Sequence, residues 1–415
     1  MKSFVAIIGG GIAGISAANE LSREKVPFAL IEKEFYAGGK SSLLCCKASE
    51  KCNRCSACVA DHRIKDFFSG RESPLHVGSY LTGIEKDEKG FNINFKKSAR
   101  SVIEEKCTSC GKCEEACPVA GKAIKLPPPG TFPKTAYIDK SLCLRSKGEN
   151  CEICAKVCPE NAVDYSQNPV NEKIYASSVI LAVGFEHFNP RDKSSFHYGI
   201  FKNVISGQEL EEALRIKGKV VRPSDGKVPS SIAYIQCAGS RDPKNTNPYC
   251  SQVCCLYAMR TALHIKEESP DTKIKIFYMD IQSDCKKEME FYNDCLARIE
   301  MERSMPGNIE ELDSGGILVT YESIEKGKNI AEEFDMVVLS TGIAATPANK
   351  MVTQMFGLKT DSSGFIESGD ESERTKTKDR RIFIAGCCQS PKNISSSMAQ
   401  GVAAARNAIE IGYGE

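Results

Sequence analysis

The chain has 415 residues, and its 55 Lys and Arg against 54 Asp and Glu give a net charge of +1, which indicates neither a nucleic-acid-binding surface nor one for anionic membranes. Its 21 cysteines are odd in number and clustered, and in a chain long enough for a large core this predicts metal-bound thiolates in a reducing cytoplasm, not the disulfides of a short secreted protein. No stretch approaches the ~20 apolar residues of a membrane span, so any membrane is expected to be reached through a partner.

A nucleotide-binding strand, turn and helix are predicted at the start of the chain. Residues 4–8 are an apolar run typical of a buried parallel strand. The motif Gly9-x-Gly11-x-x-Gly14 follows and opens a predicted helix over 12–21. Gly9 allows a tight turn, Gly11 lets the backbone approach a pyrophosphate, and Gly14 lets helix and strand pack closely. This spacing, and the charged residues after it, favour a nucleotide loop over a secretion signal.

A second strand and an acidic residue extend this prediction. Residues 28–31 are apolar, and Glu32 follows them at the place where a carboxylate accepts from a ribose hydroxyl. After a short gap comes Gly38-Gly39-Lys40, which resembles the second phosphate loop of two-dinucleotide-binding flavoproteins. That resemblance implies FAD instead of NAD. The candidate cofactor residues in this region are Gly9, Gly11, Ile12, Ala13, Gly14, Glu32, Lys33, Gly39 and Lys40.

The next segment, 45–58, carries five cysteines. Cys52-x2-Cys55-x2-Cys58 has three thiols at the spacing of a cubane cluster, and Cys45 and Cys46 are candidates for a fourth ligand. One interpretation is a third [4Fe-4S] cluster. The alternative is a loop near the flavin whose thiols are free or face a partner. The sequence leaves this choice open.

Residues 103–167 contain one cluster-binding unit twice, and each copy ends in Cys-Pro. The first copy has the C-x2-C-x2-C-x3-C-P spacing of ferredoxins with two [4Fe-4S] clusters, in which the fourth cysteine of each run ligates the other run's cluster. The second copy has seven residues, 144–150, where two are usual, and converging thiolates tolerate that enlargement. A structural zinc site is the weaker alternative, because zinc knuckles lack a third cysteine and the Cys-Pro ending. The predicted ligands are Cys107, Cys110, Cys113, Cys117, Cys143, Cys151, Cys154 and Cys158.

Two further regions are predicted beyond this insert. Residues 168–230 continue the FAD-binding domain begun by residues 1–102, with a strand that ends at Gly184. Residues 231–330 are predicted to form a nested NAD-like α/β domain. Its first strand ends in Gln236-Cys-Ala-Gly-Ser-Arg-Asp242 instead of a GxGxxG loop, and bulky residues there obstruct the approach of a pyrophosphate. We expect this domain to keep its shape without binding NAD(P) tightly.

Residues 331–415 are predicted to close the FAD-binding domain. A strand over 334–342 ends at Gly342, another over 381–386 ends at Gly386, and a helix follows over 398–411. In the flavoprotein class that this region resembles, the last strand leads into a helix whose N-terminus faces the flavin. Cys387 and Cys388 stand where the class has an acidic residue. The candidate cofactor residues here are Gly184, Gly342, Gly386, Ser397, Met398 and Ala399.

The order of these motifs resembles the A-type subunit of heterodisulfide reductase. The resemblance rests on the glycine loop, the two-cluster insert, residues 236–242, Tyr249-Cys-Ser-Gln-Val-Cys-Cys255 and Ala385-Gly-x-x-Gln-Ser-Pro391, and it covers nearly the whole chain. It implies an α/β fold, a two-dinucleotide-binding (thioredoxin-reductase-like) flavoprotein with an inserted two-[4Fe-4S] ferredoxin domain. The chain is nearer to short forms, such as the A-type subunit of the quinone-interacting membrane-bound oxidoreductase.

The same resemblance implies an oxidoreductase subunit that passes electrons between FAD and [4Fe-4S] clusters. The implied partners are iron-sulfur or heterodisulfide-reductase-like subunits, with the chain as a homodimer in a larger cytoplasmic complex. Lys286 is similar in place to a family lysine near the flavin N5, where a cation stabilises reduced flavin. A solvated surface lysine is the alternative, because Gln282 replaces a family arginine nearby. The electron donor, the acceptor and flavin-based bifurcation are left open.

Two other functions are compatible with parts of the sequence. The first is a self-contained thioredoxin-reductase-like NAD(P)H/disulfide oxidoreductase that uses Cys250 and Cys254, which share a helix face in Cys250-x3-Cys254-Cys255. The missing glycine loop argues against it, and buried structural thiols are an alternative for these cysteines. The second is a non-catalytic iron-sulfur scaffold, which the intact first glycine motif disfavours. No clear ligand spacing is found for Cys237, Cys285, Cys295, Cys387 and Cys388.

Overall fold

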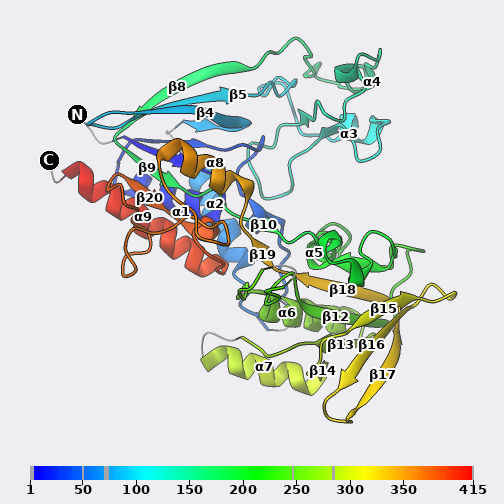
Figure 1. The fold of residues 1–415 in the computed structure, drawn as a ribbon. Helices are drawn as coiled ribbons and strands as arrows, with labels where there is room; N and C mark the ends of the chain where they lie inside the picture. Colours follow the sequence, from blue (N-terminus) through cyan, green and yellow to red (C-terminus); the bar gives the residue numbers. More distant parts are fainter. Residues whose placement is uncertain (1–3, 49–50, 70–73, 245–246, 283–285, 414–415) are drawn as a thin grey trace.

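The structure is a computed structural model that describes residues 4–48, 51–69, 74–244, 247–282 and 286–413. It has two parallel sheets, and a cysteine-rich insert extends from an antiparallel sheet beside the first of them (Figure 1). Within the described ranges, no helix combines the length and the apolarity that crossing a bilayer requires.

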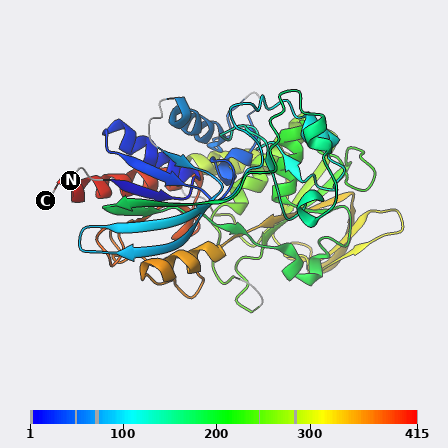
Figure 2. The same cartoon turned by 90° about the horizontal axis from the view of Figure 1, so that it is seen from above.

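The first parallel sheet has the strand order β20-β9-β1-β2-β3. Alternate side chains of a strand point to opposite faces, so Val5 and Ile7 pack under helices while Ala6 and Ile8 face the other layer. Helices α1 and α9 lie side by side on the first of these faces (Figure 2). The elements are β1 (Val5–Ile8), α1 (Ile12–Arg23), β2 (Phe28–Ile31), α2 (Ala57–Ser69), β3 (Leu75–His76), β9 (Ser178–Leu181), β20 (Ile382–Ile384) and α9 (Ile394–Tyr413).

A three-stranded antiparallel sheet covers the opposite face. Its order is β4-β5-β8, and its strands are β4 (Ser79–Lys86), β5 (Phe91–Lys97) and β8 (Val170–Ala176). Buried side chains of β5 alternate with half-buried ones, as expected for a sheet with one face on a core. Helix α8 (Pro347–Phe356) adds Val352 and Phe356 to the same apolar layer.

The cysteine-rich insert leaves the antiparallel sheet at the end of β5 and returns at the start of β8, where Lys97 pairs with Val170. Its regular elements are short: α3 (Lys112–Ala116), β6 (Ile124–Lys125), β7 (Tyr137–Ile138), η2 (Arg145–Lys147) and α4 (Ile153–Lys156). It has a small apolar core of its own, which includes Val102, Ile124 and Ile138 together with buried cysteines. The insert thus lies between two paired strands, β5 and β8.

The second parallel sheet has the order β11-β18-β12-β13-β14. Its strands are β11 (Val204–Ser206), β12 (Ser231–Ala238), β13 (Lys273–Phe277), β14 (Glu300–Glu302) and β18 (Met336–Thr341), and its helices are α5 (Gly207–Lys217), α6 (Cys254–Glu268) and α7 (Lys286–Arg298). An antiparallel sheet of β15 (Asn308–Glu311), β16 (Ile317–Ser323) and β17 (Lys328–Phe334) packs against it.

Two expectations about this region were wrong. The strand predicted over 334–342 does not join the FAD-type sheet, because β18 pairs with β11 and β12 in the second sheet. Strand β11 and helix α5, expected within 168–230 as part of the first domain, also belong to the second sheet. Since the first five residues of β18 are buried, its apolar run suits either parallel sheet, and only the pairing decides between them. Helix α9 also begins at Ile394, earlier than expected.

The chain crosses between the two parallel sheets on adjacent strands. Strand β10 (Glu186–His187) pairs antiparallel with β19 (Ile343–Ala344), so the outgoing and returning segments support each other. The remaining short helical turns are η1 (Lys40–Leu43), η3 (Pro190–Asp192), η4 (Ser194–Phe196) and η5 (Gly386–Cys388).

Candidate cluster and dinucleotide sites

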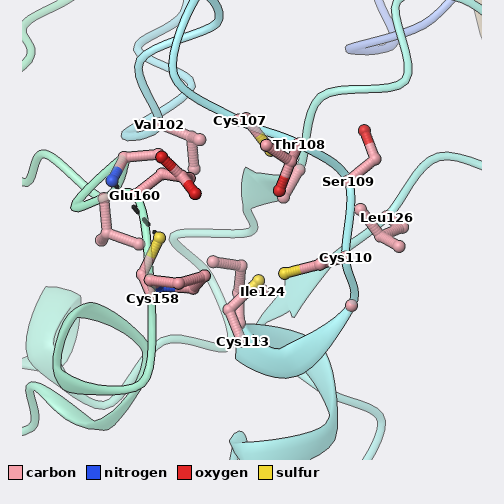
Figure 3. Close-up of a pocket in the computed structure, with 15 residues that line it drawn as sticks. Val102, Cys107, Thr108, Ser109, Cys110, Cys113, Ile124, Leu126, Cys158 and Glu160 are labelled. Atoms are coloured by element: carbon pink, nitrogen blue, oxygen red, sulfur yellow. Dashed lines mark hydrogen bonds between the residues drawn. The ribbon is translucent and has the colours of Figure 1, made fainter.

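Two cavities in the insert are each lined by four cysteines. Cys107, Cys110 and Cys113 of the first run line one cavity together with Cys158, the last cysteine of the second run (Figure 3). The second cavity contains the reverse set, Cys143, Cys151 and Cys154 with Cys117. This crossed arrangement is the one that the ferredoxin spacing predicts. The other lining residues are mostly apolar, including Val102, Ile124, Leu126, Ile138 and Ile153, which suits a cubane shielded from water.

Backbone and side-chain donors already serve several of these sulfur atoms. The amides of Ala123 and Ala162 donate to the Sγ atoms of Cys117 and Cys158, both at 3.3 Å. Burial opposes ionisation of Cys117, yet backbone donors, Ala123 first, bring its pKa below the usual value. Donors of this kind stabilise thiolate ligands and tune cluster potentials.

The enlarged loop of the second run folds compactly beside its cavity. Arg145 forms an ion pair with Glu152 at 2.8 Å and lies over the ring of Tyr165, 4.4 Å from its centroid. The Tyr165 hydroxyl lies 3.0 Å from the Sγ of Cys154. The enlarged loop therefore supplies a cation, Arg145, which packs on the Tyr165 ring that lines the cavity.

The insert contacts the first domain close to Gly38 and Gly39. Ala37 and Phe132 exchange backbone hydrogen bonds of 2.7 and 3.2 Å. The rings of Phe35 and Tyr137 stack with centroids 5.1 Å apart. The buried Arg100 guanidinium ties the two parts together, because it donates to the carbonyl of Phe35 at 2.6 Å and to that of Thr135 at 2.8 Å. The contact fixes the position of the insert on the dinucleotide fold.

The same segment of the insert continues into both cavities. Ala136 lines the first cavity and Ile138 lines the second, and Tyr137 stands between them in sequence. One short stretch of chain therefore touches the dinucleotide fold and both four-cysteine sets.

The first glycine motif has the close packing that its residues predict. Gly9 has φ +110°, and a Cβ there would collide with the carbonyl oxygen of Ala182. A Cβ on Gly14 would collide with the carbonyl oxygen of Gly9, whereas nothing lies within 4 Å of the Cβ position of Gly11. Gly39 packs against this open glycine, since its own Cβ would lie 2.7 Å from the Cα of Gly11. The open side of the loop fits the approach of a pyrophosphate.

Glu32 is buried beneath this loop. One carboxylate oxygen accepts from the amide of Gly10 at 2.5 Å, and the other accepts from the amide of Glu34 at 2.8 Å. Burial raises its pKa, and these amides oppose that rise. Glu32 therefore holds the loop in shape. Its predicted bond to a ribose would use the remaining acceptor capacity of these oxygens.

The two lysines predicted in this region share one acidic partner. Glu186 on β10 lies 3.9 Å from the Nζ of Lys33 and 3.4 Å from that of Lys40. Lys40 also lies over the ring of Phe185, 5.5 Å from its centroid. These contacts tie the first domain to the connection between the sheets.

The C-terminal candidates are only partly brought together with the glycine motif. Gly386 has φ +79°, its Cβ position lies 2.8 Å from the Cβ of Ala13, and its amide donates to Gln400 at 2.8 Å. Ser397 and Met398 are buried in the first turns of α9, and Ala399 is exposed. Gly184 has φ +76° and follows β9, with nothing within 4 Å of its Cβ position. Gly342 is elsewhere, because a Cβ there would collide with Ser240 at the edge of the second sheet.

Among the described residues, the turn after β12 in the second sheet is not an open nucleotide loop. After β12, Gly239 has φ +80°, and the ring of Phe188 occupies the place its Cβ would take. Cys237 and Arg241 also have positive φ, 54° and 58°, so the turn differs in form from a glycine loop. A covered backbone at this position obstructs the approach of a pyrophosphate, and weak NAD(P) binding by this domain stays a prediction.

Four thiols gather at this same turn. Cys237, Cys254 and Cys255 are buried and Cys250 is half-buried, and each buried thiol interacts electrostatically with others of the set. Burial, followed by these thiols, raises the pKa of Cys237 to about 11. No ligand spacing is evident for Cys237 in the sequence, because it lies near the end of β12 while Cys254 and Cys255 begin α6. Cys250 precedes α6, so the expectation that Cys250 and Cys254 share a helix face was wrong. Their adjacency comes from the packing of α6 on β12.

The cysteines of the 45–58 segment are arranged differently. The Cys45 thiol donates to Glu211 on α5 at 3.1 Å, and Glu211 forms a buried ion pair with Lys47. Cys52 and Cys58 are exposed and Cys55 is half-buried. Cys45 is therefore engaged with a carboxylate of the second domain.

The remaining predicted residue, Lys286, begins helix α7. Its side chain lies outside the described residues, as does Cys285. Cys387 and Cys388 are buried, and the thiol of Cys388 donates to the carbonyl of Leu181 at 3.3 Å. Cys388 thus belongs to the core around β9, whereas Cys387 packs with Ile343 and Phe365.

Two family models match parts of the chain. One is described as a 4Fe-4S dicluster domain and matches residues 106–162. The other is described as an NAD(P)-binding Rossmann-like domain and matches residues 7–69. The first covers the insert with its crossed cysteines, and the second covers the glycine motif and Glu32. Together they support [4Fe-4S] clusters and a dinucleotide, FAD, as the cofactors.

Curated relatives match almost the whole chain. An A-type iron-sulfur subunit of the CoB-CoM heterodisulfide reductase of Methanopyrus kandleri is 35% identical over 99% of this chain and 64% of its own length. The A-type subunit of the H2:CoB-CoM heterodisulfide, ferredoxin reductase of Methanothermobacter marburgensis is 33% identical over the same shares. The chain thus spans somewhat less than two thirds of these relatives. The predicted resemblance to the A-type subunit of heterodisulfide reductase is confirmed.

Solved structures confirm the predicted fold. Thioredoxin reductase of Lactococcus lactis matches with a TM-score of 0.55 and 16% identity over 100% of both chains. Thioredoxin reductase of T. acidophilum matches with a TM-score of 0.51 and 17% identity over 99% of this chain and 98% of its own. At this identity the likeness concerns the fold alone.

Proposed function

We propose that the chain is an FAD- and iron-sulfur-dependent electron-transfer subunit of a heterodisulfide-reductase-like oxidoreductase complex. The observation that carries this is the pair of crossed four-cysteine cavities on an insert fixed against a dinucleotide-binding loop. When bound, FAD exchanges electron pairs and [4Fe-4S] clusters exchange single electrons. The chain's own residues hold the cofactors in place and exclude water, and the terminal reaction belongs to partner subunits.

Cofactor analysis tests this proposal directly. Iron, sulfide and flavin are measured per chain after strictly anaerobic purification, and about eight irons with one FAD are expected for two cubanes. Flavin without iron, even after reconstitution, would sink the cluster assignment. Iron without flavin would leave only an electron relay.

A third cluster has two candidate sites. We favour Cys237, Cys250, Cys254 and Cys255, because these thiols interact with one another while Cys45 is bonded to Glu211. With a third cluster the iron content rises to about twelve per chain. Cys237→Ser is then expected to remove about four irons and Cys58→Ser none; the reverse result would assign the cluster to the 45–58 segment.

A self-contained NAD(P)H/disulfide oxidoreductase using Cys250 and Cys254 is the second candidate. The Phe188 ring over Gly239 and the raised pKa of the buried Cys254 both disfavour it. Oxidation of NADH or NADPH by the isolated FAD-loaded chain discriminates the two functions. Turnover that is abolished by Cys254→Ser would overturn the electron-transfer assignment.

The proposal extends to partners and to Lys286. The relatives are named as subunits of reductases, which supports iron-sulfur or heterodisulfide-reductase-like partners, and we propose a cytoplasmic homodimer within such a complex. Lys286 is proposed to lie near the flavin N5, so Lys286→Ala is expected to lower the flavin reduction potential. An unchanged redox titration would reject that role.

A further inference from the structure

The loop between β20 and α9 contains a lysine that has no carboxylate partner among the described residues. The Nζ of Lys392 donates instead to neutral oxygens: the carbonyl of Gly386 at 2.9 Å, and Gln389 Oε1, the Ser390 carbonyl and Ser390 Oγ, each at 3.0 Å. An ammonium has three donors, so this cage satisfies its hydrogen bonds. It leaves the positive charge uncompensated.

The topology places this charge beside the candidate dinucleotide site. The first sheet has the order β20-β9-β1-β2-β3. Strands β2 and β3 lie on one side of β1, and the later strands β9 and β20 lie on its other side. The strand order therefore reverses between β1 and β9. Ligands of open α/β sheets bind at the carboxyl ends of the strands at such a switch point. Lys392 follows β20, and the Gly386 that it contacts packs on Ala13 in the first turn of α1.

The two sides of the switch point differ in charge. Glu32 follows β2 and marks the side where the ribose of a dinucleotide is expected. On the opposite side, where related flavoproteins have an acid, Cys387 and Cys388 are buried thiols. The ionisable groups that interact electrostatically with Lys392 are these two cysteines and Arg374. This side of the switch point therefore carries a cation, Lys392, where the resemblance implies an anion.

We propose that Lys392 is a positioning cation of the flavin site, held in its oxygen cage so that its charge raises the affinity of the bound flavin for electrons. The inference rests on the proposed FAD site. Reduced flavin carries more negative charge than oxidised flavin, and a fixed positive charge in a partly dehydrated site stabilises it. Because the donors of Lys392 are already used, its effect is that of a charge and not of a direct hydrogen bond.

The test uses the FAD-loaded full chain and compares Lys392→Gln, Lys392→Arg and the exposed control Lys378→Gln. The readout is the midpoint potential of the flavin, with the EPR potentials of the clusters as an internal reference. Lys392→Gln is expected to weaken flavin reduction at least about tenfold, which is about 30 mV for a two-electron couple. Lys392→Arg keeps the charge and is expected to stay near the unmodified value, as is the control.

A second variant separates charge from loop structure. Cys387→Asp restores an acid beside the ammonium and is expected to lower the flavin potential while Lys392 stays in place. Retained FAD with an unshifted potential in both Lys392→Gln and Cys387→Asp would overturn the inference, even if stability fell. Absence of FAD from the unmodified chain would instead overturn the proposed function.

Discussion

Removing Lys47 is expected to destabilise the contact between the two domains. Lys47 is 1% exposed and Glu211 is 2% exposed, and their ion pair joins the 45–48 segment to helix α5. The Cys45 amide also donates to Glu211, at 3.1 Å, and the Lys47 ammonium donates to the Cys45 carbonyl at the same distance. The pair is thus part of a closed buried network.

The magnitude follows from the charge that is left behind. Breaking a buried pair by removing one partner costs about 3–5 kcal/mol, because the other charge stays buried. Glu211 keeps its two donors from Cys45, so we expect Lys47→Met to cost about 3 kcal/mol, the lower end of that range. For a domain of this size the thermal midpoint of the second domain should fall by roughly 6–12 °C.

The assay is thermal unfolding followed by hydrogen exchange in α5. The matched control is Lys65→Met, which removes an exposed ion pair with Asp61 at 2.7 Å and should cost under about 1 kcal/mol. The double variant Lys47→Met/Glu211→Leu should recover much of the loss, because no unpaired charge remains. A Lys47→Met shift no larger than that of the control would refute the reasoning.

Three further predictions concern single side chains. Cys117→Ser is expected to alter the EPR signal of the cluster held by the second cysteine run and to leave that of the first run unchanged. Cys158→Ser is expected to alter the signal of the cluster held by the first run and to leave that of the second unchanged. A change confined to the cluster of each residue's own run would contradict the crossed assignment. Burial, then the charge of Lys40, lowers the pKa of His187 to about 4, so unfolding is accompanied by proton uptake between about pH 6.5 and 4. The contribution of His187 to the free energy of unfolding should be fully present above this window and should fall within it by at most about 3 kcal/mol. His187→Phe should flatten this part of the curve of stability against pH. Burial, then the charge of Glu211, raises the pKa of Cys45 to about 12, so its thiol stays protonated at pH 8. Iodoacetamide should therefore label Cys45 far more slowly than the exposed Cys46. Equal labelling rates would exclude the buried network around Glu211.

Local spacing explains what could be predicted for the cluster insert. The predicted ligands and their crossed arrangement follow from the spacing C-x2-C-x2-C-x3-C-P, because a cubane requires three converging thiolates and a fourth from elsewhere. This prediction does not depend on the pairing of β5 with β8, which flank the insert. The enlarged loop, 144–150, was also compatible with the pattern, although its Arg145 contact with Tyr165 was not foreseeable.

The sequence by itself determined the first glycine motif and its acid Glu32, because these depend on residues close together in the chain. The thioredoxin-reductase-like fold class was implied by the resemblance of its motifs to a known family. Only the tertiary structure decided that β18 joins the second sheet, since a strand apolar on both faces fits any buried neighbour. It also brought Cys237 to the thiols of α6, and placed the Lys392 ammonium against the carbonyl of Gly386. Such contacts depend on which elements pack together, and burial then sets the charges and pKa values of the groups involved.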